Sequence, residues 1–182
     1  MRTTSSLVVL WVMLHCIAAI GQQKSVPLGT QLRLRWHGKS VVVIKGSDRF
    51  EYSLDDELNS YELDSVKLLS AKESNGFIYL LLEANGPSRG RSAMSGYCGA
   101  GFESDLVWLK LNARWDMVDS SSFLQGSCLQ SVDGDEPAKW NGSVYHFEVI
   151  NRHEATWYSV TYSFREPGKG LQIVSKPAPS TP

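Results

Sequence analysis

The chain has 182 residues, of which 42% are hydrophobic, 20% charged and 10% aromatic. This composition excludes a disordered chain, which would contain fewer apolar residues, and the length fits a single domain. The 18 lysines and arginines are balanced by 19 aspartates and glutamates. The sequence therefore lacks the electrostatic signature of a nucleic-acid partner or of attraction to an acidic membrane surface.

The first 21 residues have the pattern of a secretory signal peptide. Arg2 is the only charge before an apolar stretch at residues 7–20, which is shorter than the roughly 20 residues of a membrane-spanning helix. The small residues Ala19 and Gly21 precede Gln22 at the positions that a signal peptidase requires. We therefore expect cleavage after Gly21 and a secreted or periplasmic protein without stable membrane insertion. An uncleaved N-terminal anchor is the alternative interpretation.

The cysteines fit export. Cys16 would be removed with the signal peptide, and Cys98 and Cys128 would remain. These two predict a disulfide, because exported proteins fold in an oxidising compartment. The bond would contribute roughly 3 to 4 kcal/mol by restricting the unfolded chain. The Cys-x-x-Cys spacing of a redox pair is absent and the histidines lack ligand spacing, so we expect no metal and no cofactor.

Residues 31–174 are predicted to form a single all-β domain. Alternating apolar and polar residues predict strands at residues 32–36, 144–149 and 157–164, and continuous apolar runs predict strands covered on both faces at residues 41–44, 77–82 and 106–111. A turn at residues 167–170 leads into a last strand at residues 171–174. About eight to ten strands favour an antiparallel sandwich, barrel or propeller-like meander.

Three other segments have different patterns. Residues 54–63 are the best candidate for a short helix or turn, because Leu54, Leu58 and Tyr61 follow at spacings of four and three. Residues 22–30 are expected to be a polar lead-in. The proline-rich residues 175–182 are expected to be a disordered tail.

Residues 85–104 are predicted to be a long loop that carries five glycines between two apolar strands. Glycines permit a close approach of backbone to a ligand, and long loops in small domains are commonly functional. Arg89 and Arg91 can bind an anionic group through paired hydrogen bonds, and Tyr97 and Phe102 offer faces for stacking. The alternative interpretation is a solvated hairpin connection whose glycines form bulges.

The loop contains the motif Y-C-G-A-G-F-E at residues 97–103, followed by L-V-W-L-K-L at residues 106–111. Over about fifteen residues, this pair of motifs resembles a segment of small exported bacterial proteins of unknown function. The resemblance implies bacterial export and no particular activity. Residues 95–97 (S-G-Y) are similar to short Ser-Gly loops of periplasmic lysozyme inhibitors. That similarity implies inhibition of an envelope-degrading enzyme as an alternative function.

Catalytic and aromatic candidates are few. His146 and Glu148 face the same side of a predicted strand, where they can serve as base and orienting acid of a small secreted hydrolase. The alternative for this pair is a polar strand face. Trp36 and Trp115 border charged turns and are expected to be exposed, whereas most other tryptophans are expected to pack in the core.

These observations favour a non-catalytic exported domain that binds a protein or a cell-envelope component. The expected contact residues are Arg89, Arg91, Tyr97 and Phe102. A loop tethered by the disulfide would lose less freedom on binding than an untethered one.

Overall fold

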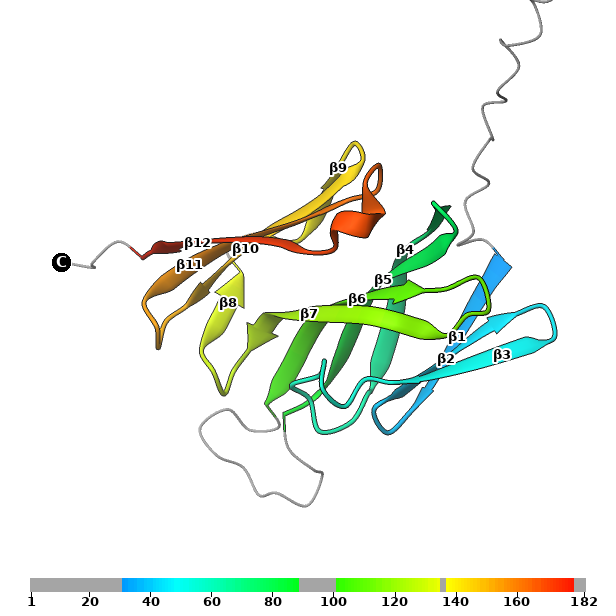
Figure 1. Ribbon diagram of the computed structural model, residues 1–182. Coiled ribbons are helices and arrows are strands. Elements are labelled where there is room, and N and C mark those ends of the chain that lie inside the picture. Colours follow the sequence, from blue (N-terminus) through cyan, green and yellow to red (C-terminus); the bar gives the residue numbers. More distant parts are fainter. Residues whose placement is uncertain (1–30, 89–100, 135–136, 179–182) are drawn as a thin grey trace, which may run out of the picture.

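Twelve β-strands make up most of the described part of the chain, which in the computed structural model comprises residues 31–88, 101–134 and 137–178. A short 3-10 helix, η2 (Pro167–Lys169), precedes the last strand (Figure 1). Within these ranges no helix is long and apolar enough to cross a membrane. The strands are β1 (Leu32–His37), β2 (Ser40–Lys45), β3 (Asp48–Ser53), β4 (Ser65–Ser74), β5 (Phe77–Pro87), β6 (Phe102–Leu111), β7 (Met117–Ser127), β8 (Val132–Gly134), β9 (Lys139–Asn141), β10 (Val144–Asn151), β11 (Thr156–Ser163) and β12 (Gln172–Pro177).

The strands form two antiparallel sheets, neither of which closes into a barrel. One sheet has the order β1-β2-β3, and the other has the order β12-β11-β10-β8-β7-β6-β5-β4, with β9 also paired to β10. The predicted all-β antiparallel class is therefore confirmed. The expected eight to ten strands were too few for the described residues, because β8 and β9 have three residues each. Such short strands leave no recognisable alternation in the sequence.

The strands β4 to β7 form the middle of three layers (Figure 1). The small sheet β1–β3 covers one face, and the strands β10 and β11 of the large sheet fold over the other. Successive side chains of a strand point to opposite faces, so β5 contributes to two cores. Leu80 and Leu82 point toward β1–β3, whereas Tyr79 and Leu81 point toward β10 and β11.

The first core, between β1–β3 and the middle layer, is mostly aliphatic. Val41 and Val43 of β2 meet Leu80 of β5 and Leu109 of β6, and all four side chains are fully buried. Branched aliphatic side chains fill such a layer without polar atoms that need partners. The apolar runs at residues 77–82 and 106–111 thus lie in the middle layer, which is covered on both faces, whereas residues 41–44 lie in an outer layer where Val42 is only half-buried.

The second core is rich in aromatic residues and is closed at one end by η2. Tyr79 stacks on Trp108 with 6.2 Å between ring centroids. The indole nitrogen of Trp108 donates a hydrogen bond to the carbonyl of Pro167 at 3.0 Å. Gly170 follows with a positive φ of 66° and lies against the same indole, so a side chain there would be strained.

Residues 54–63, predicted as a short helix or a turn, form a turn, with Leu54 and Leu58 buried in the first core. Other predicted boundaries differ from the structure. The strands β5 and β6 extend into both ends of the predicted loop at residues 85–104, because backbone pairing continues as far as Pro87 and Phe102. The strand β12 runs to Pro177, three residues into the predicted tail, because it pairs with β11 along this length.

Candidate functional site

The predicted contact residues lie at and beyond the ends of β5 and β6. Phe102 begins β6 and is 51% exposed, as a stacking role requires. Arg89, Arg91 and Tyr97 lie outside the described residues. So does Cys98, while Cys128 lies in the turn after β7; the disulfide therefore stays a prediction.

The structure describes the base from which residues 89–100 emerge. The backbone N–H of Ser88 donates to the carbonyl of Gly101 at 2.7 Å, and the N–H of Tyr61 donates to the carbonyl of Pro87 at 2.8 Å. Gly86 lies so close to the carbonyl of Glu62 that a Cβ would collide with it. The base is thus held by β5, β6 and the turn at residues 54–64.

Two carboxylates are buried beneath this base. Glu103 and Asp105 point from β6 toward the turn at residues 54–64, and both are almost completely shielded from solvent. Asp105 accepts hydrogen bonds from the backbone N–H of Asn59 at 3.0 Å and from its side-chain amide at 2.7 Å. The hydroxyl of Ser88 donates to Glu103. Each carboxylate therefore fastens a neighbouring segment to β6.

The electrostatics of Asp105 reflect its burial. Desolvation raises the pKa of Asp105 to about 6, and the nearby Glu103 carboxylate adds to the increase. The hydrogen bonds from Asn59, and the charge of Lys39, oppose it. Burial dominates because transfer of a charge out of water costs more than two amide hydrogen bonds return.

The network continues to the turn after β7. The side-chain amide of Gln130 donates to Asn59 at 3.2 Å, and its backbone N–H donates to the hydroxyl of Ser127 at 2.9 Å. The hydroxyl of Ser60 and one oxygen of Glu103 are buried without a hydrogen-bond partner among the described residues. Three segments are joined here: the loop base, the turn at residues 54–64 and the turn that contains Cys128.

The sequence analysis missed both carboxylates, although a signal was present. Glu103 and Asp105 alternate with the same period as Val107 and Leu109, and that period places all four on one face of β6. Charged residues on a core-facing register need partners inside the protein. The pattern therefore predicts a buried polar network where only a loop end was expected.

His146 and Glu148 have no catalytic geometry. They lie on the outer face of β10, opposite the buried Tyr145 and Phe147, and more than a third of each side chain is exposed. The same ring nitrogen of His146 lies 3.1 Å from the Ser159 hydroxyl and 3.9 Å from the Glu148 carboxylate. A relay needs the two ring nitrogens to serve different partners.

The tryptophans divide differently from the prediction. Trp36 is exposed as expected, at 39%, but Trp115 is only 7% exposed. Trp115 stacks on Phe50 with 4.9 Å between centroids, and its carbonyl accepts a hydrogen bond from the Tyr52 hydroxyl at 2.8 Å. Its charged sequence neighbours concealed a position that closes the edge of the first core. Trp140, which was not singled out, is as exposed as Trp36.

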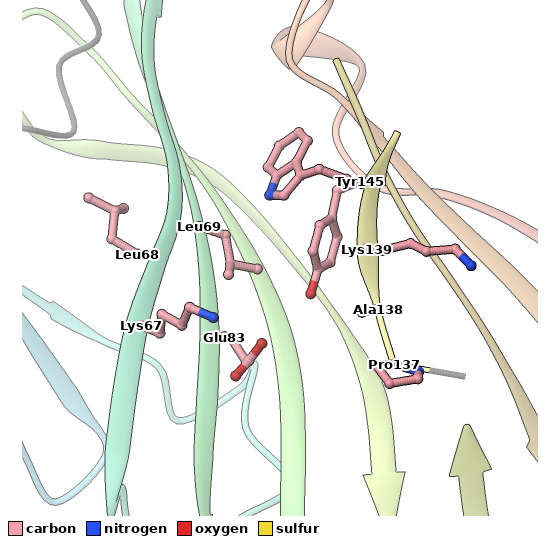
Figure 2. A pocket seen from close by; sticks show the side chains of 9 residues that line it. Lys67, Leu68, Leu69, Glu83, Pro137, Ala138, Lys139 and Tyr145 are labelled. Atoms are coloured by element: carbon pink, nitrogen blue, oxygen red, sulfur yellow. The ribbon is translucent and has the colours of Figure 1, made fainter. Parts of the chain in front are cut away.

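A cleft separates the middle layer from β9 and β10 (Figure 2). Its volume is about 440 Å³, and it opens between the β4 side of the middle layer and the segment at residues 137–140. Figure 2 shows Leu69, Glu83 and the Tyr145 hydroxyl turned into it, whereas Lys139 points away. A second cavity of about 240 Å³ shares Glu83 with the first.

Comparison with protein-family models, with curated proteins and with solved structures found no match to this chain.

Proposed function

We propose that this chain is an exported, non-catalytic binding domain that presents residues 89–100 to a protein or cell-envelope partner. The support for export is the signal-peptide pattern of residues 1–21. The partner is expected to carry an anionic group for Arg89 and Arg91, with Tyr97 and Phe102 adding stacking surface.

The observation that carries the proposal is the construction of the loop base. Ser88 and Gly101 are hydrogen-bonded to each other in this base, and the buried Glu103 and Asp105 fasten the base and its neighbouring turn to β6. A solvated hairpin connection would not need two shielded carboxylates beneath it, because their burial is costly. A fixed base restricts the start and end of the loop, which lowers the ordering cost of binding.

The loop base also allows a direct test of whether residues 89–100 contact the partner. Replacing residues 89–100 with Asn-Gly should give a tight hairpin, because these two residues favour the required turn and Ser88 and Gly101 already form a hydrogen-bonded pair. Partners captured from a cell-envelope extract by the unaltered protein should be lost with the shortened variant. Replacing residues 89–100 also removes Cys98 and with it the predicted disulfide. Cys128→Ser, which removes the disulfide but keeps the loop, is therefore measured in parallel.

A charge-matched comparison refines the result. The double variant Arg89→Ala/Arg91→Ala should weaken capture of the same partner, and the loss should shrink with salt because exposed charges are screened. Arg33→Ala/Arg35→Ala is the control, since these arginines have the same spacing and are exposed on β1. Unchanged capture by the shortened variant would remove the loop from the contact surface.

Export has its own measurement. N-terminal sequencing of protein recovered from the envelope or medium should begin at Gln22. Recovery of a chain that still carries residues 1–21 would support the membrane-anchor alternative instead.

A further inference from the structure

The cleft between the middle layer and β9–β10 is independent of the loop base. It lies on the second-core side of β5, where Glu83 points, whereas Glu103 and Asp105 lie on the first-core side of β6. Its volume of about 440 Å³ falls within the range of small-molecule sites, roughly 300 to 1,000 Å³. From its geometry we propose that this cleft binds a neutral saccharide, with Trp140 as the stacking face.

Trp140 is positioned before any ligand arrives. Its ring lies 5.3 Å from that of Tyr145 and 6.4 Å from that of Tyr162, in an edge-to-face arrangement with the latter. Both tyrosines are buried in the second core. A 39% exposed indole supported in this way presents a fixed apolar face at low entropic cost.

Hydrogen-bonding groups face this aromatic wall. Lys67 of β4 and Glu83 of β5 are cross-strand partners, and Figure 2 shows both charged ends directed toward the space between the layers. Glu83 also lies near enough to the Tyr145 hydroxyl to help burial raise the pKa of that group. The second cavity adds Ser104 and Gln125 beyond Glu83.

The mixture of groups selects the ligand class. A wholly apolar ligand would desolvate Lys67 and Glu83 without compensation. The opposite charges of Lys67 and Glu83 lie side by side, so the attraction of an anion or a cation to one is offset by its repulsion from the other, and neither charge is favoured. A saccharide has an apolar C–H face for Trp140 and hydroxyls that both donate and accept, so its neutral form satisfies both walls.

The test uses three neutral tetrasaccharides: cellotetraose, maltotetraose and tetra-N-acetylchitotetraose. Isothermal titration calorimetry on the purified protein should detect at least one of them with a Kd of about 1 mM or below, and neither tetragalacturonate nor tetralysine at equal concentration. Trp140→Ala should weaken binding at least about tenfold, and Glu83→Gln about fivefold, because a charged acceptor is replaced by a neutral one.

Trp36→Ala is the matched control, because Trp36 has the same exposed fraction but lies on β1. It should leave the Kd unchanged within about twofold, a difference of roughly 0.4 kcal/mol. Trp140→Phe should retain most of the affinity, and the thermal midpoints of all variants show whether each remains folded. If Trp140→Ala does not fold, Glu83→Gln carries the test, since Glu83 is not a member of the second core.

Three results would overturn the proposal. They are no binding of any neutral tetrasaccharide at 10 mM, binding only of the charged probes, and equal losses in the variants of Trp36 and Trp140. The variant with residues 89–100 replaced should still bind the saccharide. Its behaviour separates this site from the partner surface proposed for the loop.

Discussion

The two faces of the middle layer are filled in different ways. Toward β1–β3, aliphatic side chains from β2, β5 and β6 close a core whose polar end is sealed by buried carboxylates. Toward β10 and β11, aromatic rings and η2 close one end, while the layers part elsewhere to form the cleft. One face is closed by a separate sheet, whereas the other is closed by the far half of its own sheet.

The difference shows how one pair of strands can line a closed core on one face and an open cleft on the other. A sheet that folds over itself is joined along one side, here through β8, which pairs with both β7 and β10. The layers can separate away from that joint, and the exposed Trp140 and half-buried Glu83 occur there. The separate sheet β1–β3 is not hydrogen-bonded to the strands of the middle layer, and the hollow on that side, about 480 Å³, lies at its edge between β3 and residues 115–117.

The largest expected effect on stability comes from truncating two adjacent side chains of β5, one in each core. Leu80 and Leu81 are both fully buried, so Leu80→Ala and Leu81→Ala should each lower the free energy of unfolding by about 3 kcal/mol. Urea unfolding followed by tryptophan fluorescence and circular dichroism measures both. Val174→Ala, at an exposed position of β12, should change it by less than about 0.5 kcal/mol.

If the two layers unfold together, both variants shift one common transition. A loss below about 1 kcal/mol for Leu81→Ala alone would show that the second core is loosely packed. The comparison between the faces would then change, because the aromatic layer would contribute little to stability.

The next effect concerns the polar end of the first core. Because the pKa of Asp105 is raised from 3.8 to about 6, the folded protein holds this proton more tightly than the unfolded chain. The contribution of Asp105 to stability is therefore greatest at low pH and declines as pH rises from about 4 to about 6, by up to about 3 kcal/mol. Unfolding measured across this range should show the decline.

Asp105→Asn should flatten the pH dependence in that window, since the uncharged amide does not titrate. Asp119→Asn removes the same charge from an exposed position of β7 and controls for net charge. An equal slope in Asp105→Asn and the unaltered protein would contradict the assignment of this decline to Asp105.

The sequence predicted the layers better than the connections between them. Residues 77–82 and 106–111 were predicted as strands covered on both faces, and Leu80, Leu81, Leu106 and Leu109 are all fully buried. The strand β4 escaped detection because a bulge between Leu68 and Ser70 shifts the register and breaks the alternation. The strand β7 was missed because serines occupy its centre.

The candidate sites were less predictable because they depend on segments distant in sequence. The cleft joins β4 and β5 to residues 137–140 and β10, and only the folding-over of the large sheet brings these together. The buried Asp105 could be suspected from its register, but its partner Asn59 lies in a turn 46 residues earlier. Local periodicity reports which face a residue occupies and not what covers that face.

A smaller effect is expected at Gly86, where the loop base meets the turn at residues 54–64. Gly86→Ala would place a Cβ against the carbonyl of Glu62, and the required backbone shift should cost about 1 to 3 kcal/mol in thermal or urea unfolding. Gly126→Ala on β7 is the control, because its Cβ would meet only an ordinary contact with Ser104. Equal effects of the two substitutions would show that the base is not tightly packed.

The smallest effect is expected on the outer face of β10. His146→Ala should change the free energy of unfolding by less than about 0.5 kcal/mol, because partly exposed side chains and ion pairs contribute little. Saccharide titration of the same variant should match the unaltered protein, since His146 points away from the second core, which lies beside the cleft. A loss above about 1 kcal/mol would instead assign a structural role to the contact between His146 and Ser159, because surface positions without such a role tolerate substitution.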